Sequence, residues 1–399
     1  MIQEIKIKNF LSFKDEVTFS FLASEDKFAE ESQVVQIDEN TRLLRFAVIY
    51  GYNASGKSNL ITAVFHLLLF WRYRPVDLNS GTQIIPFKLD ETSYKEPTEF
   101  ELTFFSEKIK YLYQLKLDRD KVLFEKLSYF KGNQPTMLFE RRFENNQSVI
   151  DFNNGEDGDS INETAKNELI VKCWKNISFF AARGQVNVNL PLIDNAFKWS
   201  REHFLRPILP KHDLTNIAEK TISENNKALE HILNFLNEAD FNITGINSEK
   251  LDESKGFTTT FEHTIENASS KETYYLNKNE ESLGTLRTFG LETIIFKAKE
   301  DNSFLMIDEI ETSLHNKLLE KILFDFLRAD STSQLLVTTH NDSLLELVDD
   351  LIRKDSVYFI EKDKAGASDL YKLTDFKGID KLSSIREAYR YKRFGATMK

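Results

Sequence analysis

The strongest chemical pattern in the sequence is residues 51–58, GYNASGKS, which matches G-x-x-x-x-G-K-[ST] at each fixed position. An apolar run over residues 43–50 precedes it, and an apolar stretch reaching about Tyr73 follows it. This context predicts a buried strand, a tight loop and a helix. Backbone N–H groups of such a loop surround phosphate groups. The alternative, a turn that binds no ligand, is disfavoured because only 14 of 399 residues are glycine.

ATP and Mg²⁺ are the ligands that this loop predicts. Lys57 is expected to reach the β- and γ-phosphates, and the Ser58 hydroxyl is expected to ligate Mg²⁺. The predicted nucleotide-binding residues of the loop are Asn53, Ala54, Ser55, Gly56, Lys57, Ser58 and Asn59.

A second pattern is the apolar run 304–307, FLMI, followed by Asp308 and Glu309. Four apolar residues predict a buried strand whose carboxyl end carries two acids, where ligands bind in open α/β sheets. Asp308 is expected to hold Mg²⁺ through a water molecule, and Glu309 is expected to polarise the attacking water. A strand ending in two acids is common, so an exposed turn is the alternative. The phosphate loop in the same chain favours the functional interpretation.

Two further segments carry candidate residues. His340 follows the predicted strand 335–339 and is expected beside the position of the γ-phosphate, with a catalytic role. Ser282 and Gly284 stand at the start of the predicted helix 283–299. A helix N-terminus with Ser and Gly is a candidate anion site. An ordinary capped helix is the alternative for that segment.

The order of these segments resembles the ABC-type ATPase head, as in SMC proteins. Residues 308–315, DEIETSLH, look like the Asp-Glu-x-Glu-x-x-Leu-His form of OLD-type and RloA/AbiLi-type ATPases of prokaryotic anti-phage defence. The opening residues 5–13 and the tail 389–396 are similar to the ends of that group. No glutamine matches the Mg²⁺-sensing position clearly; Gln83 is a weak candidate and Gln114 a weaker one.

The resemblance implies an α/β fold: an ABC-type head with a mainly parallel sheet, antiparallel strands and an inserted mixed α+β or helical region. It implies a homodimer or higher homo-oligomer in which Ser282 and Gly284 complete the partner's nucleotide site. It also implies control of a separately encoded, nuclease-like effector in anti-phage abortive infection. Only 59 residues follow His340, so the C-terminal nuclease domain of OLD-type proteins is not expected.

Two other functions remain open at this stage. A DNA-repair or recombination ATPase would act directly on DNA, and a nucleotide-dependent scaffold would bind ATP with negligible turnover. A basic groove on the assembled dimer would favour the first, and turnover no faster than buffer would favour the second.

Composition limits the partners. Because the net charge is −11, binding of DNA or RNA would need a local basic patch or a partner that supplies one. Nucleic acid stays a candidate partner through the basic-aromatic clusters 71–74, 141–143 and 386–393. Solvated helix faces and contacts with a protein partner are the alternative for these clusters. We expect no membrane partner, because the longest apolar run, residues 64–71, is far too short for a span. The single cysteine, Cys173, favours a cytoplasmic location.

The pattern of elements predicts three regions. Residues 1–99 form the first half of the head, and residues 281–399 form the second. Residues 100–280 contribute antiparallel strands (98–152), a helical stretch (161–240) and a short β segment (241–278) for partner or substrate docking. The aromatic side chains of residues 162–209 are the first candidates for a docking surface, and this region's own core is an equal alternative.

Overall fold

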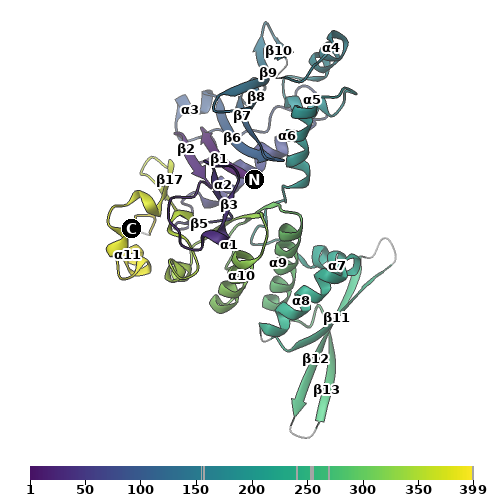
Figure 1. Cartoon of the computed structure of the whole chain (residues 1–399), viewed down its shortest axis with the longest axis vertical. Helices are drawn as coiled ribbons and strands as arrows, with labels where there is room; N and C mark the ends of the chain where they lie inside the picture. The colour runs from purple at the N-terminus through teal and green to yellow at the C-terminus, as the bar shows by residue number, and fades with distance from the viewer. Residues whose placement is uncertain (154, 156–157, 240, 252–255, 268–269, 398–399) are drawn as a thin grey trace.

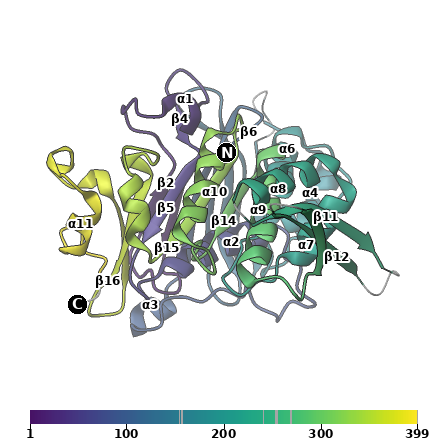
Figure 2. The ribbon, with the colours of Figure 1, turned by 90° about the horizontal axis from the view of Figure 1, so that it is seen from below.

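The computed structural model describes the chain except residues 154, 156–157, 240, 252–255, 268–269 and 398–399. A five-stranded sheet of order β14-β15-β5-β16-β17 carries the candidate site (Figures 1 and 2). Its first four strands are parallel, and β17 is antiparallel to β16. In sheet order the strands are β14 (Phe304–Ile307), β15 (Gln334–Thr339), β5 (Phe46–Tyr50), β16 (Val357–Lys362) and β17 (Ser368–Lys372).

A seven-stranded antiparallel sheet forms the second layer, with the order β10-β9-β8-β7-β6-β1-β2. Its strands are β1 (Ile2–Lys8), β2 (Val17–Ser20), β6 (Thr98–Ser106), β7 (Ile109–Leu117), β8 (Val122–Phe130), β9 (Pro135–Glu144) and β10 (Gln147–Phe152). The predicted α/β class with parallel and antiparallel strands is confirmed. The predicted division between residues 99 and 100 falls inside β6, which pairs with β1.

Helix α2 (Lys57–Phe70) follows the glycine-containing loop and contributes to the core between the two sheets. Side chains from several sides of the helix are buried, including Leu60, Val64 and Leu67. A helix that is apolar on most sides needs such an enclosed position. The helix ends at Phe70, three residues before the predicted end, and Trp71 then packs against Phe180.

The opposite face of the parallel sheet has its own core, built with helices from the second half of the chain. Figure 2 shows α10 lying across the strands β5 and β15. A three-stranded antiparallel sheet extends away from this side (Figure 1). The helices are α7 (Thr215–Glu224), α8 (Asn226–Glu238), α9 (Leu283–Glu300), α10 (Asn316–Arg328) and α11 (Ile385–Arg390), and the extending strands are β11 (Ile243–Lys250), β12 (Phe257–Asn267) and β13 (Ser270–Asn277).

The predicted strand over residues 43–50 is two strands. Strand β4 (Arg42–Leu44) pairs with β3 (Val34–Gln36), whereas β5 joins the parallel sheet. The break falls at Arg45, which is 2% exposed. Its guanidinium donates to the carbonyl oxygens of Ser32 (2.8 Å), Ala329 (2.6 Å) and Phe326 (3.2 Å). A buried cation requires such acceptors, and these hydrogen bonds hold Arg45 in place between β4 and β5.

The aromatic side chains of residues 162–209 belong mainly to the core. Phe179, Phe180 and Trp199 are at most 3% exposed, and Phe180 stacks on Phe197. Trp174, at 38% exposed, is the exception. The core interpretation is therefore supported, and the buried rings provide no docking surface. The helices of this stretch are α4 (Glu163–Lys172), α5 (Phe179–Arg183) and α6 (Pro191–Glu202).

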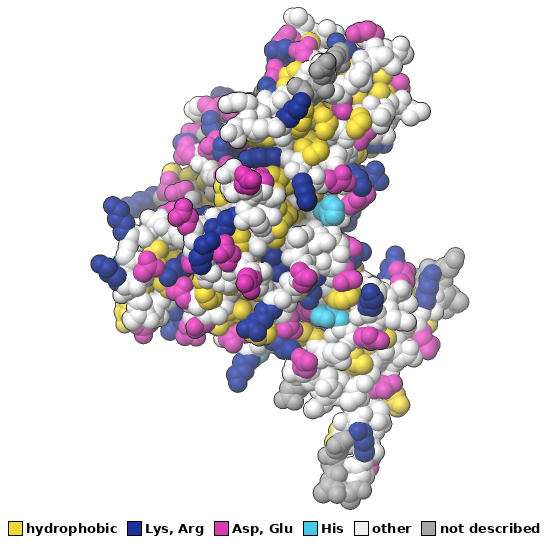
Figure 3. Space-filling view, in the orientation of Figure 1, with side chains coloured by type: hydrophobic (Ala, Val, Ile, Leu, Met, Phe, Trp, Pro, Cys, Tyr) yellow, Lys and Arg dark blue, Asp and Glu magenta, His cyan; other side chains and the backbone are white. Residues whose placement is uncertain are grey.

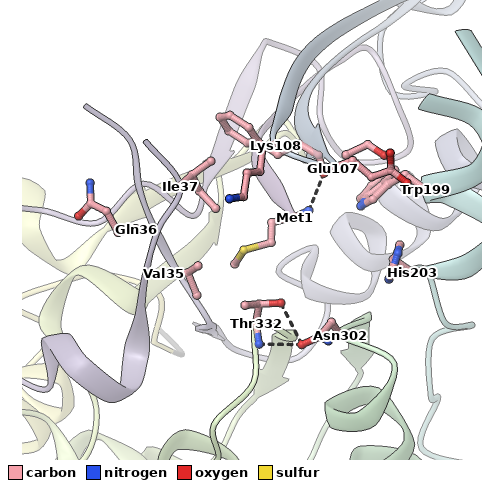
Figure 4. A pocket seen from close by; sticks show the side chains of 12 residues that line it. Met1, Val35, Gln36, Ile37, Glu107, Lys108, Trp199, His203, Asn302 and Thr332 are labelled. Carbon is pink, nitrogen blue, oxygen red and sulfur yellow. Dashed lines mark hydrogen bonds between the residues drawn. The ribbon is translucent and has the colours of Figure 1, made fainter. Parts of the chain in front are cut away.

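Short helices complete the fold. They are α1 (Glu30–Gln33), α3 (Glu91–Lys95) and the 3₁₀ helices Asp342–Leu347, Lys354–Ser356, Leu373–Asp375 and Ile379–Lys381. A cavity of about 330 Å³ lies where segments distant in the sequence meet, and Figure 4 shows Met1, Val35, Trp199, His203 and Thr332 around it. None of the predicted site residues lines this cavity.

Candidate functional site

The glycine-containing loop connects β5 to α2, and Gly56 gives it its shape. Gly56 has a φ of +118°, which side chains rarely allow. A Cβ atom there would lie 2.4 Å from Ser368 Oγ and 2.8 Å from Ser12 Oγ. The Ser368 hydroxyl, on β17, donates to the carbonyl oxygen of Ser55 at 2.6 Å. The loop is thus held from outside by β17 and by the segment that follows β1.

The amine of Lys57 lies inside the curve of the loop. Its Nζ donates to the carbonyl oxygens of Gly51 (2.7 Å) and Tyr52 (3.2 Å), and the residue is 5% exposed. Burial lowers the pKa of Lys57 from its ordinary value, and the carboxylates of Glu309 and Asp308 partly offset that shift. A desolvated ammonium group near the start of a helix is a strong attractor for phosphate oxygens.

The two acids after β14 are fixed by neighbouring elements. Ser58 Oγ donates to Asp308 Oδ2 at 2.7 Å, and Thr338 Oγ1 donates to Asp308 Oδ1 at 2.5 Å. The same Thr338 oxygen accepts the backbone N–H of Glu309 at 2.9 Å. Glu309 has a φ of +48°, an uncommon conformation for this residue type. Thr338 therefore positions both acids, although no pattern in the sequence marks it for this role.

A cavity of about 310 Å³ opens above the loop. It brings together six of the seven predicted loop residues and Glu309, and it adds Lys362 from the end of β16. Its lining residues are Asn53, Ala54, Gly56, Lys57, Ser58, Asn59, Glu309 and Lys362. Lys362 has no sequence signal, because only the parallel pairing of β16 with β5 brings it beside the loop. Its backbone also hydrogen-bonds to the hydroxyl group of Tyr52.

Five predicted site residues do not line this cavity. They are Ser55 and Asp308, which lie in the loop and beside Ser58, and His340, Ser282 and Gly284. The Nδ1 atom of His340 lies 2.8 Å from Glu311 Oε1, and half of its side chain is exposed. Ser282 caps α9 by accepting the N–H of Thr285 at 3.0 Å. Gly284 packs against the next loop, since a Cβ atom there would lie 3.3 Å from the Ser313 carbonyl oxygen. Within one chain, the start of α9 therefore does not line the cavity around Lys57.

Both candidate glutamines also lie outside the cavity. Gln83 donates to the carbonyl oxygen of Ser80, and Gln114 donates to Glu101 on the antiparallel sheet. In the part of the chain that the structure describes, no group of three or more His, Cys, Asp and Glu side chains is placed to hold a metal ion.

The basic-aromatic clusters are largely occupied by internal contacts. Arg141 is fully buried and pairs with Glu125 at 3.2 Å. Arg386 and Arg390 both pair with Asp342, and Trp71 is buried. Figure 3 shows Lys and Arg interspersed with Asp and Glu over the visible face. These arginines are therefore engaged in contacts within the chain.

The chain is similar to known proteins. A family profile described as "AAA domain, putative AbiEii toxin, Type IV TA system" matches residues 46–346, more than half of the chain. A Helicobacter pylori protein named "ATP/GTP phosphatase" is 24% identical over 385 residues, covering 89% of each chain.

Solved structures of low identity are also similar to the chain. The SMC head domain from Thermotoga maritima matches 93% of this chain and 98% of its own, with a TM-score of 0.44 and 13% identity. An SMC head bound to the C-terminal winged-helix domain of ScpA matches 97% of this chain and 99% of its own, with a TM-score of 0.47 and 12% identity.

No helix among the described residues is long and apolar enough to cross a membrane.

The family profile spans β5, the glycine-containing loop of residues 51–58, α9, the two acids after β14, and β15. The chain belongs to this family of AAA-domain ATPases.

Proposed function

We propose that the chain binds ATP with Mg²⁺ in the cavity above residues 53–59 and hydrolyses it within a head-to-head dimer. One observation carries the proposal: Lys57, Ser58 and Glu309 line the same cavity, and Asp308 lies directly behind Ser58. Lys57 and Ser58 follow the carboxyl end of β5, and the two acids follow the carboxyl end of β14 in the same parallel sheet. This edge of a parallel sheet is where α/β proteins bind ligands.

Each residue has a distinct task in this proposal. The loop N–H groups and Lys57 bind the β- and γ-phosphates, and Glu309 accepts a proton from the attacking water. The Ser58 hydroxyl and the Asp308 carboxylate are hard oxygen ligands of the type that Mg²⁺ prefers, so the residues present fit this ion. When bound, Mg²⁺ supplies positive charge that stabilises the phosphate oxygens.

Thr338→Val should reduce ATP hydrolysis about 10- to 100-fold while ATP binding persists, the size of effect seen for residues that orient ligands. The change removes the hydroxyl that holds Asp308 and the N–H of Glu309, at nearly constant volume. The Mg²⁺ concentration for half-maximal rate should rise. Steady-state kinetics at varied Mg²⁺ concentration measures the hydrolysis rate and the Mg²⁺ concentration for half-maximal rate. Thr338→Ser keeps the hydroxyl and should retain most activity; equal rates for Thr338→Val and the natural protein would refute the assignment.

A second copy is proposed to complete the site. Ser282 and Gly284 do not line the cavity of their own chain, and the neighbouring Leu283 is 78% exposed. In a twofold dimer the start of α9 from one copy faces the nucleotide of the other, which gives two equivalent sites. The helix N-terminus then adds N–H groups and a favourable dipole to the terminal phosphate.

Ser282→Arg tests this dimer. A bulky cation at the start of α9 should block the contact and leave each chain's own loop intact. We expect ATP binding to persist while the dependence of specific activity on protein concentration disappears. Titration calorimetry measures the binding, and a dilution series of turnover measures the assembly.

Ser384→Arg is the matched control, because Ser384 caps α11 as Ser282 caps α9. Both variants lose a helix cap, which costs about 1 kcal/mol of stability, but only Ser282→Arg should affect cooperative turnover. Unchanged turnover together with an unchanged ATP-dependent mass by light scattering would contradict the proposal.

The cellular role is proposed to be control of a separately encoded effector in anti-phage defence, such as a nuclease-like protein. The family description, which names a toxin of a type IV toxin–antitoxin system, supports a two-component arrangement. Copurification of the native complex from its host, with identification of the bound protein, tests this role. The purification is done once with the natural protein and added ATP, and once with Glu309→Gln, which should retain bound ATP. Recovery of the chain without a partner in both purifications would argue against an effector.

A further inference from the structure

Lys362 is a second cation of the cavity above the loop, and the proposed function gives it no task. It ends β16 and lines the cavity together with Lys57, Ser58 and Glu309. In the part of the chain that the structure describes, its side chain forms no ion pair and no hydrogen bond; its bonds to Tyr52 use the backbone N–H and carbonyl oxygen. Its ammonium group is therefore available to a ligand in the cavity.

The alternation of side chains along β16 places Lys362 on the α2 side of the parallel sheet. Val357 and Phe359 belong to the core on the opposite face. Tyr358 and Ile360 belong to the core to which α2 contributes. Because successive side chains of a strand point to opposite faces, Lys362 points to the same side as Ile360 and α2.

The pairing of β16 with β17 indicates the same direction independently. Lys362 lies opposite Ser368 in this antiparallel ladder. Side chains of directly opposite residues share one face of a sheet, with Cβ atoms about 5 Å apart. The Ser368 hydroxyl donates to the carbonyl oxygen of Ser55 at 2.6 Å and occupies the space where a Cβ atom of Gly56 would lie. The Lys362 side chain thus leaves β16 towards the loop, on the side of the cavity that it lines.

The acids next to Lys362 in the chain do not take up its charge. Glu361 points to the other face of the sheet, where its carboxylate accepts the hydroxyl of Tyr371 at 3.4 Å. The Asp363 carboxylate accepts the backbone N–H of Ala367 at 2.8 Å, within the turn that joins β16 to β17. Lys362 therefore brings an uncompensated positive charge to the cavity.

The net charge of the cavity lining depends on this lysine. Lys57 and Lys362 contribute two positive charges and Glu309 one negative charge, so the lining has one net positive charge with Lys362 and none without it. Tyr52 also connects the two lysines: its carbonyl oxygen accepts from Lys57 Nζ at 3.2 Å, and its hydroxyl bonds to the Lys362 backbone at 3.1 and 3.2 Å. The two cations thus come from segments that are fixed to each other.

We propose that Lys362 is a nucleotide-binding residue whose ammonium group donates to the phosphate chain held by the loop and Lys57. This inference rests on the proposed function and adds a second phosphate-binding lysine from a different strand. A lysine ammonium group carries three donors on a flexible stem and acts on phosphate as a point charge. Because Lys362 is partly exposed, salt should screen its attraction to the phosphates.

Lys362→Met tests the inference, because it removes the charge and keeps an unbranched side chain. We expect the ATP affinity to fall about tenfold or more, as for the loss of a hydrogen bond between charged groups. The difference from the natural protein should become smaller as the salt concentration rises. Lys362→Arg keeps the charge and should retain most of the affinity. Titration calorimetry with ATP and Mg²⁺ at two ionic strengths measures these affinities.

Lys364→Met is the matched control, because Lys364 is exposed in the same turn and does not line the cavity. Its ATP affinity should match that of the natural protein. An equal loss in Lys362→Met and Lys364→Met would assign the effect to the overall charge of the turn and overturn the inference.

A role of Lys362 in positioning Glu309 predicts a different result. Lys362→Met would then bind ATP at the natural affinity and hydrolyse it more slowly, which would overturn the inference while Lys57→Ala still abolishes binding. Failure of the natural protein to bind ATP would overturn the proposed function and this inference with it. The melting temperature of Lys362→Met without nucleotide should be unchanged, because the bonds to Tyr52 use the backbone. If this variant does not fold, Lys362→Gln replaces it with the same expected loss of affinity.

Discussion

Lys57→Ala should abolish measurable ATP binding. The ammonium group of Lys57 is the buried cation of the cavity above residues 53–59, and without it the phosphate charge has no close partner inside the loop. The substitution also removes the donor to the carbonyl oxygens of Gly51 and Tyr52, so the loop loses part of its own support. Titration calorimetry with ATP and Mg²⁺ measures the loss.

Lys198→Ala is the control for a general loss of positive charge, because Lys198 lies on the surface of α6 with 55% of its side chain exposed. Its ATP affinity should match that of the natural protein. Circular dichroism of Lys57→Ala should show an intact fold. ATP binding by Lys57→Ala at the natural affinity would show that the nucleotide binds elsewhere.

Glu309→Gln should bind ATP normally and hydrolyse it about 10²- to 10⁴-fold more slowly, the usual contribution of a general base. Glutamine has nearly the same shape, and the backbone N–H at this position still donates to Thr338. It lacks the carboxylate that accepts the proton of water. Single-turnover kinetics measures the chemical step, and light scattering should show an ATP-bound dimer that accumulates.

Glu311→Gln is the matched control, because it changes another acid of the same loop. Glu311 pairs with His340 and does not line the cavity. Its effect on the chemical step should be much smaller than that of Glu309→Gln. Hydrolysis by Glu309→Gln at the natural rate would exclude Glu309 as the base, and an equal loss in both variants would assign the effect to loop geometry.

The sequence was sufficient for features that depend on neighbouring residues. The spacing of residues 51–58 specifies the loop, because its glycine, lysine and serine residues are close together in the sequence. The apolar runs before Asp308 and His340 specified buried strands, which the structure has as β14 and β15. The helix over 283–299 was predicted for the same local reason, and its cap by Ser282 was the alternative to an anion site there.

Features that depend on tertiary contacts were missed or misjudged. Threonine is common at strand ends, so nothing in the sequence marked Thr338 as the group that holds both acids. Lys362 had no local pattern either. The break at Arg45 was missed because the carbonyl oxygens that bind its guanidinium group include two from residues 326 and 329.

The sequence by itself thus determined which segments could bind phosphate and carry acids, since hydrophobic period and motif spacing are properties of contiguous residues. Only the tertiary structure decided which of these groups meet. The contact between Ser58 and Asp308 joins residues 250 positions apart, and that between Ser55 and Ser368 joins residues 313 positions apart. Such contacts follow from strand order in the two sheets, which is set by the packing of the whole core and not by any local pattern.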